Sequence, residues 1–407
     1  MKQFLAVSLI CLGLGIGKEA SGQTVTSGSS FCSNHSNSLY CLLPVLYANA
    51  QPNPFTPLTA AFASQLTQVP LASPASGIIY TLNPALKIPE RSGQETYGPV
   101  LTERGDTMGK NKIFVSATYQ HFDFSSLDGI SLKEIPVVFN YCNSTGQCAP
   151  ISTINRVDLK VNQSAFFATY GLLEKLDLSV AIPINDVHMA GQGISCVVPL
   201  CNGPTDPSNT QVQFKPKKSA NQANGIGDIV FRVKYRAISR GRTKVAVGGD
   251  FRLNSGDELN FLGAGTAGFK PFVAVSRGGL ISPHLNVSYQ RNGDSLLGGS
   301  EAGVKGKLPD SLSYALGIDA AINKRATVAF DFIGEHVYDQ LRIKQTVTLG
   351  VPDIALGSGN FNAAKGAAGV KYNPFSNFLI SVNTLWRMDH NGLRNKTVPL
   401  AGISYTF

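Results

Sequence analysis

The chain has 407 residues, of which 41 are glycine and 15% are charged, and its formal net charge is +9 at pH 7. The lysines and arginines are scattered singly and form no basic patch, which argues against nucleic acid as a partner. The glycine content, the low charge and a mean hydropathy near zero are typical of a secreted all-β chain whose strands have an apolar and a polar side. On length alone, two soluble domains are the alternative.

The first residues have the pattern of a secretion signal. Lys2 provides a short charged start, residues 4–17 are an apolar run, and small residues precede a cleavage position before Gln23. This run is shorter than the roughly 18 to 20 apolar residues that a membrane-spanning helix needs, and no later stretch reaches that length without charges. We therefore expect residues 1–22 to be a signal peptide and expect no helical membrane anchor.

Residues 23–110 differ from the rest of the chain, since they hold nine of the 22 prolines and few alternating runs. An apolar stripe from Pro54 to Val69 predicts a short helix, because proline suits the first turn of a helix. A hairpin is expected over residues 77–90, with its turn at Asn83 and Pro84. We interpret this part as a periplasmic segment or as a plug of a barrel lumen.

From residue 111 onward the chain alternates between apolar and polar residues in stretches of about ten, which predicts strands with one apolar face. Residues 227–237 show this most clearly, because Phe231, Val233 and Tyr235 alternate with Arg232 and Lys234. Such strands are expected over residues 112–124, 155–170, 176–187, 227–237, 243–254, 269–277, 281–292, 311–322, 325–338, 362–373, 378–389 and 396–407. The count is twelve, or fourteen if the hairpin of residues 77–90 joins the wall.

The joints between these strands alternate between short and long, as in outer-membrane barrels with short periplasmic turns and long external loops. Residues 339–360, between two of the predicted strands, are expected to be a loop rich in glycine and apolar residues. A soluble β-sandwich also has many regularly spaced strands. A sandwich would not place charged residues opposite a wholly apolar face so regularly. We therefore predict an all-β transmembrane antiparallel barrel over residues 111–407, with its apolar face toward outer-membrane lipid in the bacterial cell outer membrane.

The last strand carries a further signal. Ile403 and Tyr405 alternate with Ser404 and Thr406, and the chain ends on Phe407. This end resembles the closing strand of bacterial outer-membrane β-barrels, whose last residue is typically Phe and whose third-from-last is often Tyr. That resemblance implies that Tyr405 and Phe407 are read by the outer-membrane barrel assembly machinery.

Six cysteines remain after signal removal, in three pairs that are close in sequence. An even number at short spacing in an exported chain predicts disulfides that staple loops, although six cysteines allow 15 connectivities. The spacing is unlike that of zinc sites and no histidine cluster accompanies it, so we expect no metal. The pairs are Cys32 with Cys41, Cys142 with Cys148, and Cys196 with Cys201.

Residues 97–114, 166–184 and 225–235 carry a family resemblance. In order along the chain they resemble barrels of the phenol meta-pathway type of outer-membrane protein, which are distantly similar to long-chain fatty-acid and aromatic-hydrocarbon channels. In the fatty-acid channels an Asn-Pro-Ala motif lies in the N-terminal plug, and Asn83-Pro84-Ala85 matches it. The resemblance implies passive uptake of small hydrophobic or aromatic compounds without a cofactor.

Enzyme signals are poor. Residues 263–268 fit the dinucleotide pattern Gly-x-Gly-x-x-Gly, but a strand rather than a helix follows them, so a flexible loop is the better interpretation. The six histidines are scattered. His284 with Ser282 or Ser288 could form a hydrolase site only if a polar group oriented the histidine, and a hydrated wall position is the better explanation. We expect no enzyme and keep a structural or adhesive barrel, or a lipid hydrolase, as alternatives to a channel.

The predicted polar face suggests which solutes pass. On it we count eleven cations against seven carboxylates, and an excess of positive charge in a narrow lumen favours anions. The cations are Arg156, Lys160, Arg232, Lys234, Arg236, Lys244, Arg252, Lys270, Lys365, Lys371 and Arg387, and the carboxylates are Asp158, Asp177, Asp228, Asp250, Asp319, Asp331 and Glu335. Part of this set is expected to brace the wall. On this assignment Arg156, Asp158 and Lys160 also point into the barrel interior. The residues proposed to line the lumen and select solutes are Arg232, Lys234, Arg236, Lys244, Arg252 and His284, and the expected solute is a small aromatic or fatty compound, including carboxylates.

Overall fold

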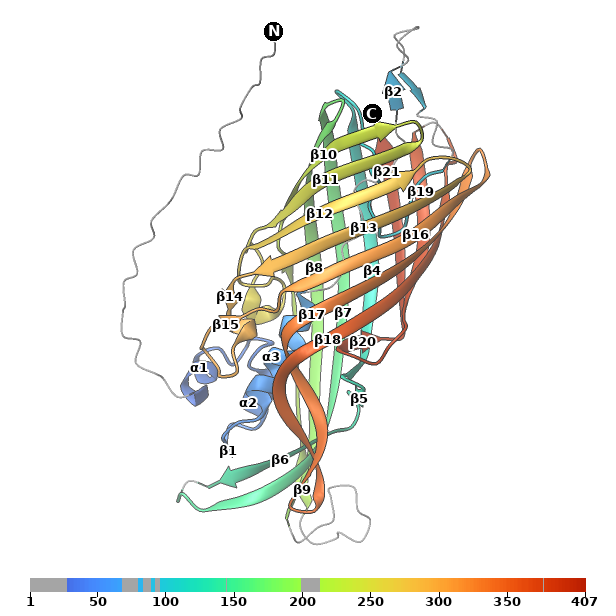
Figure 1. The fold of residues 1–407 in the computed structure, drawn as a ribbon. Helices are drawn as coiled ribbons and strands as arrows, with labels where there is room; N and C mark the ends of the chain where they lie inside the picture. The colour runs from blue at the N-terminus through green and yellow to red at the C-terminus, as the bar shows by residue number, and fades with distance from the viewer. Residues whose placement is uncertain are drawn as a thin grey trace, which may run out of the picture.

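The computed structural model describes residues 28–67, 80–82, 89–91, 96–143, 145–198, 213–375 and 377–407. The predicted signal peptide, the Asn83-Pro84-Ala85 motif and Cys201 lie outside these residues. The described chain is mainly a large antiparallel barrel with three helices near one end (Figure 1). No helix among the described residues is long and apolar enough to cross a membrane.

The elements follow one another in a simple order. The N-terminal part contains α1 (Gly28–Asn34), α2 (Leu42–Leu46), β1 (Ala50–Gln51), α3 (Phe55–Leu66), β2 (Tyr80–Leu82) and β3 (Pro89–Arg91). The wall strands are β4 (Ile113–Leu127), β7 (Cys148–Leu173), β8 (Leu176–Val197), β10 (Val230–Arg240), β11 (Thr243–Arg252), β12 (Gly268–Arg277), β13 (Ile281–Asn292), β16 (Ser311–Asn323), β17 (Ala326–Thr348), β18 (Val351–Tyr372), β19 (Phe378–Arg387) and β21 (Thr397–Thr406). The connections hold β5 (Ile130–Ser131), β6 (Ile135–Cys142), β9 (Gln213–Ile226), η1 (Glu258–Asn260), β14 (Asp294–Ser295), η2 (Leu296–Gly298), β15 (Gly306–Lys307) and β20 (Leu393–Asn395).

The twelve wall strands form a closed ring. Each pairs antiparallel with its neighbours in sequence order, β21 pairs with β4, and β8 pairs with β10 across the connection that contains β9. All twelve predicted strands are therefore confirmed. The predicted hairpin of residues 77–90 does not join the wall, because β2 and β3 pair only with each other.

The outer face of the ring is apolar, as the alternation predicted. On β21, Ile403 is 51% exposed and points away from the lumen, whereas Thr406 on the opposite face is buried. A surface that displays large apolar side chains on strand after strand is stable only against lipid. Its members include Ile113, Val115, Tyr119, Phe231, Val233, Tyr235, Val247, Phe251, Leu285, Val287, Leu316, Phe330, Val370, Val382 and Ile403.

The two ends of the barrel differ. The short turns that join β7 to β8, β10 to β11, β12 to β13, β16 to β17 and β18 to β19 all lie at the upper end in Figure 1, together with the C-terminus. The long connections and the three helices lie at the other end. Short turns face the periplasm in outer-membrane barrels, so the helices lie at the extracellular mouth.

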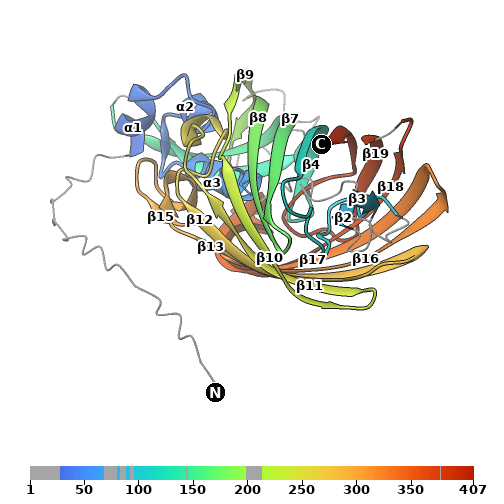
Figure 2. The same cartoon turned by 90° about the horizontal axis from the view of Figure 1, so that it is seen from above.

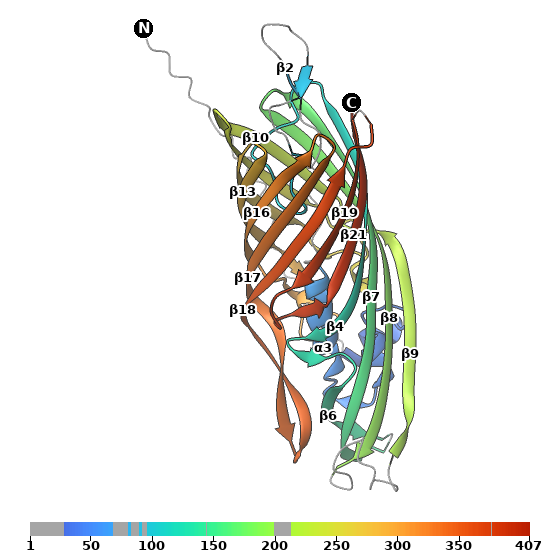
Figure 3. The same ribbon diagram turned by 90° about the vertical axis from the view of Figure 1, so that its right-hand side faces the viewer.

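Four strands continue beyond the membrane at this mouth. β7 has 26 residues and β17 has 23, whereas about 9 to 11 residues suffice for a tilted transmembrane strand. Residues 339–360, which the sequence suggested to be a loop, are the outer halves of β17 and β18, paired as a projecting hairpin. Figure 3 shows this hairpin on one side of the mouth and the extensions of β7, β8 and β9 on the other.

The N-terminal helices fill the space between these extensions. The helix predicted near Pro54 is α3, and eleven of its twelve residues are buried. Seen from the short-turn end (Figure 2), α3 lies within the ring of strands, whereas α2 lies beside β9 and α1 beside α2. Leu43, Leu58 and Phe62 share one hydrophobic core with Leu132 of the β5–β6 connection and Ile354 of the projecting hairpin, so the mouth is packed like a small soluble domain.

Candidate functional site in the barrel lumen

A segment that precedes the first wall strand runs along the inside of the barrel at the periplasmic end. We call residues 96–108 the inner segment. The backbone N–H groups of Val100, Leu101 and Thr102 donate to Asp331 Oδ2 of β17 at 3.0, 2.8 and 3.3 Å. Buried backbone donors need partners, and one lumen carboxylate supplies three of them here. The inner segment is therefore fixed to the wall by the wall's own charges.

Glu103 of the inner segment holds two of the predicted selectivity residues. Its carboxylate lies 2.5 Å from Arg232 Nη1 and 2.8 Å from Lys234 Nζ. Arg232 also contacts Asp250 at 2.6 Å, and the Lys234 side chain is almost fully buried. Both cations face the lumen as predicted, but they are neutralised within a network, and Glu103 did not figure in the prediction.

The other predicted lumen residues also have partners. Arg236 lies 3.4 Å from Asp106 and donates to the Glu174 carbonyl, and Arg252 lies 3.5 Å from Asp228. Lys244 donates to the Ser239 hydroxyl at the rim of the short-turn end. The wall and the inner segment together therefore neutralise most of the charges that the sequence assigned to the lumen.

His284 lies between two carboxylates on neighbouring strands. Its Nδ1 is 3.2 Å from Asp319 Oδ1 and its Nε2 is 3.2 Å from Asp331 Oδ1, and the side chain is fully buried. Both ring nitrogens thus face acids, which leaves neither free to take a proton from Ser282 or Ser288. This geometry does not fit the hydrolase alternative at this position.

The predicted charge balance of the interior needs correction. Arg156, Asp158 and Lys160 lie on the outer face of the β7 extension, because the inward residues there are Val157, Leu159 and Val161. Asp158 and Lys160 pair with each other at 3.3 Å and are both solvent-exposed. Without these three, and with Glu103, Arg104 and Asp106 of the inner segment included, ten cations face eight carboxylates, so the positive excess falls from four to two.

A cavity of about 290 Å³ lies in the lumen, on the mouth side of the inner segment. We call it the inner cavity. Its walls combine ion-paired residues with apolar ones, and Thr67 at the end of α3 touches it from the mouth side. The wall residues include Leu101, Glu103, Phe167, Arg232, Asp250, Arg252, Lys270, Phe272, Asn286, Ser288, Ser313, Ile333, Glu335 and Lys365.

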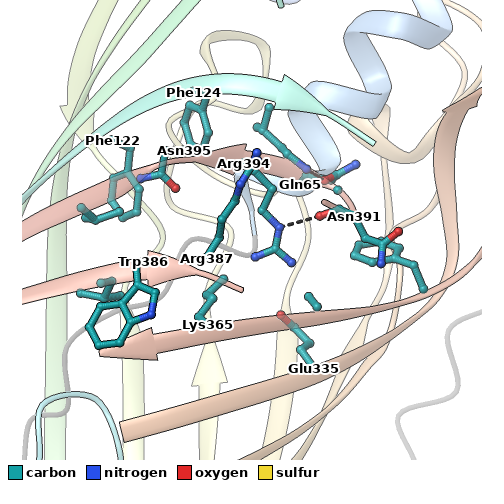
Figure 4. Close-up of a pocket in the computed structure, with 16 residues that line it drawn as sticks. Gln65, Phe122, Phe124, Glu335, Lys365, Trp386, Arg387, Asn391, Arg394 and Asn395 are labelled. Atoms are coloured by element: carbon teal, nitrogen blue, oxygen red, sulfur yellow. Dashed lines mark hydrogen bonds between the residues drawn. The ribbon is translucent and has the colours of Figure 1, made fainter. Parts of the chain in front are cut away.

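A second, smaller pocket of about 60 Å³ lies beside α3 at the mouth (Figure 4). We call it the mouth pocket. It shares Glu335 and Lys365 with the inner cavity, so the two spaces adjoin. Its remaining walls are Gln65 of α3, aromatic and aliphatic side chains, and two arginines, with the lining residues Phe122, Phe124, Phe361, Leu385, Trp386, Arg387, Asn391, Leu393, Arg394, Asn395 and Val398.

Side chains around the mouth pocket tie the plug helix to the barrel. Gln340 Nε2 of β17 donates to the Ser64 hydroxyl at 2.7 Å, and the Leu393 backbone N–H donates to Gln65 Oε1. Asp128, at the tip of β4, accepts from the Arg342 guanidinium at 2.7 Å, and its side chain is only 2% exposed. The mouth is thus closed by specific hydrogen bonds as well as by apolar packing.

Two predicted disulfides are present. Cys32 pairs with Cys41, which joins α1 to the start of α2, and Cys142 pairs with Cys148 across the β6–β7 hairpin. The Cys142 pair lies in the extracellular part, as predicted for a loop staple. Cys196 lies one residue before the end of β8, and its predicted pairing with Cys201 involves a residue outside the described ranges, so it stays a prediction.

These features define a class of protein. A closed ring of twelve antiparallel strands, with an apolar outer face and a charged interior, is a transmembrane β-barrel of the bacterial outer membrane. The final strand closes this ring, because the backbones of Phe407 and Ile113 exchange hydrogen bonds and Phe407 itself is 61% exposed. Reading of Tyr405 and Phe407 by the assembly machinery stays a prediction.

The chain is only distantly similar to known proteins. No family model and no curated protein matches the chain. An outer membrane channel from Pseudomonas putida F1 matches 75% of this chain and 99% of its own, with 9% identity and a TM-score of 0.44. A FadL homologue from Pseudomonas aeruginosa matches 82% of this chain and 94% of its own, with 8% identity and a TM-score of 0.33.

The P. putida toluene transporter TodX matches 73% of this chain and 89% of its own, with 10% identity and a TM-score of 0.34. The chain is therefore distantly similar to outer-membrane channels of known structure. At identities of 8 to 10% and TM-scores below 0.5, these similarities carry no functional argument.

Proposed function

We propose that this barrel is an outer-membrane channel for passive uptake of small hydrophobic or aromatic compounds, including carboxylates. The observation that carries the proposal is the pair of adjoining spaces between α3 and the inner segment, the inner cavity and the mouth pocket. A wall braced for structure alone would be expected to pack closely. Here the lumen keeps about 290 Å³ open, with aromatic rings and cations side by side.

We further propose that residues 23–110 act as the plug of this channel. α3 occupies the mouth, and its bonds to Gln340 and Leu393 would have to break or shift before a solute could enter. These hydrogen bonds contribute about 1 kcal/mol each, and the apolar packing around α3 has to loosen as well, so we propose a local shift of the helix without unfolding of the barrel. The inner segment, bound by Asp331, would remain in place as a constriction at the periplasmic end of the lumen.

Current through planar lipid bilayers tests the channel. With a concentration gradient of sodium benzoate across the bilayer, the sign of the reversal potential separates current carried by benzoate from current carried by sodium, and leakage of the neutral acid through lipid carries no current. We expect a benzoate current from the purified protein. In a Ser64→Cys, Gln340→Cys variant, oxidation should tie α3 to β17 and lower the current, and a reductant should restore it. The parent protein given the same reductant is the control, because its native disulfides are then also reduced.

A protein that carries no current under either condition would contradict the proposal. The filled mouth, with α3 buried at eleven positions, is the observation that would then favour a structural or adhesive surface barrel. Current that is identical in the oxidised and reduced double-cysteine variant would support a channel but contradict the plug.

A further inference from the structure

Buried hydrogen-bond donors without partners gather in the mouth pocket. Arg394 is 3% exposed, yet its Nη1 has no acceptor among the described residues, and neither have Gln65 Nε2 and Asn395 Nδ2. The amide of Gln65 cannot simply be turned, because its oxygen accepts from the Leu393 N–H. A buried donor without an acceptor costs about 1 to 3 kcal/mol, so three in one pocket call for an acceptor that fills it.

The charges around the pocket indicate the sign of that acceptor. Lys365 forms no ion pair within the described part of the chain, and Arg387 donates only to the Ser126 hydroxyl, at 2.8 Å. Arg394 is paired with Asp389 at 3.1 Å, and Glu335 also lines the pocket. Three cations against two carboxylates leave one positive charge, which a single negative group would neutralise.

The pocket walls would strengthen such an interaction. Phe122, Phe124 and Phe361 surround the donors with apolar surface, and charge pairs are stronger where water is excluded. The volume limits what enters, because about 60 Å³ is well below the roughly 150 Å³ of a cavity that binds benzene. A ring would therefore have to extend past Lys365 and Glu335 into the inner cavity.

We propose that the mouth pocket binds the carboxylate of a small organic acid, whose apolar part lies in the adjoining inner cavity. Arg394, Arg387 and Lys365 supply the positive charge, and Gln65 supplies a neutral donor. This inference deepens the proposed function by naming a site and a substrate class. It also differs from the sequence-based expectation, which placed the anion on Arg232, Lys234, Arg236 and Arg252.

Calorimetric titration of the full-length protein in detergent tests the site without requiring transport. The probes are benzoate, its neutral analogue benzyl alcohol and the cation benzylammonium. We expect benzoate to bind about tenfold or more tightly than benzyl alcohol, since charge-assisted hydrogen bonds to buried donors are the stronger kind. Equal affinity for benzoate and benzyl alcohol would overturn the proposal.

Three variants locate the binding. Lys365→Met and Arg387→Gln should each lower benzoate affinity about tenfold or more and leave benzyl alcohol binding unchanged. The matched control is Lys371→Met, on the same strand and the same inward face but bonded to the Pro99 carbonyl of the inner segment, which should retain benzoate binding. Full benzoate preference in both pocket variants would place the anion elsewhere and refute the site.

Folding of each variant is checked by its faster gel migration before heating. The outcomes also separate the two proposals. Benzoate binding without any current would support the proposed binding site and contradict the proposed channel. A benzoate current without preferential binding of benzoate over benzyl alcohol, or with unchanged benzoate binding in both pocket variants, would support the channel and contradict the proposed binding site.

Discussion

At the scale of single residues, the lumen charges serve mainly to hold the chain to itself. Arg232 contacts Glu103, which lies 129 residues earlier in the sequence, and Asp250 on the next strand. Alternation correctly predicts that Arg232 faces inward, because side chains of a strand alternate between faces. It does not identify the partner, because the inner segment has no regular pattern of its own. Charge reversal at Arg232 would bring three acids together and disturb the fold, so it is a poor test of selectivity.

The first prediction concerns Asp331, which anchors the inner segment. Asp331→Asn removes the negative charge and replaces one acceptor oxygen by a donor, so the N–H groups of Val100, Leu101 and Thr102 keep at most one neutral and weaker acceptor. We expect a loss of about 2 to 3 kcal/mol in the stability of this attachment. Hydrogen exchange of these three amides should become faster.

A matched control is Asp158→Asn on the outer face of β7, where the carboxylate is 46% exposed and exchange should not change. Unchanged exchange of residues 100–102 in Asp331→Asn would show that other contacts fix the inner segment.

A second prediction concerns the closure of the mouth. Arg342→Met leaves the Asp128 carboxylate buried with two backbone donors, Ile343 and Gly392, but without its cation. The expected loss is about 1 to 3 kcal/mol, measured as a lower midpoint of thermal unfolding. Lys344→Met, on the same strand but exposed, is the control and should have no effect. Equal midpoints for the two variants would mean that the Arg342 pair contributes little.

At the scale of elements, periodicity predicts the wall well and its extensions poorly. Every wall strand was expected near its observed place because lipid on one side and water on the other impose a period of two. The outer halves of β17 and β18 leave the membrane, where neither face meets lipid, so residues 339–360 lose that period and were interpreted as a loop. The β2–β3 hairpin was expected, yet its place outside the wall depends on contacts that a local pattern does not contain.

A third prediction tests the assigned lipid face. Ile403→Arg places a cation in the apolar band and should lower stability by about 2 to 4 kcal/mol if the position is near the midplane, with reduced outer-membrane levels. Removal of Phe407 should also impair assembly. Val347→Arg, at a position 70% exposed on the projecting hairpin, is the control and should accumulate normally. Normal levels of Ile403→Arg would contradict the assigned face.

A fourth prediction concerns the extracellular staples. The Cys142–Cys148 disulfide closes a small loop, and on chain-entropy grounds its removal should destabilise the β6–β7 hairpin by about 2 to 3 kcal/mol. Mass spectrometry of non-reduced peptides should find this pair and also Cys196 with Cys201. Free thiols or crossed pairs in the folded protein would refute the pairing.

At the scale of the whole molecule, the candidate site was only partly accessible to sequence reasoning. Lys365 and Arg387 were counted among the interior charges, because they lie on regular strands. Arg394 and Gln65 were missed, since the first lies in an irregular connection and the second on a helix more than 300 residues away. Arg394 and Gln65 come together only because α3 lies in the mouth, and the local sequence pattern of neither segment predicts that contact.

The position of the helices has a consequence for biogenesis. α1, α2 and α3 pack at the extracellular mouth, yet the chain returns to the periplasmic end to begin β4 (Figure 1). The ring closes where β21, the last wall strand, pairs with β4, the first. We expect the N-terminal helices to move outward together with the loops before this seam is sealed. Closure of the barrel is then the step that holds them at the mouth.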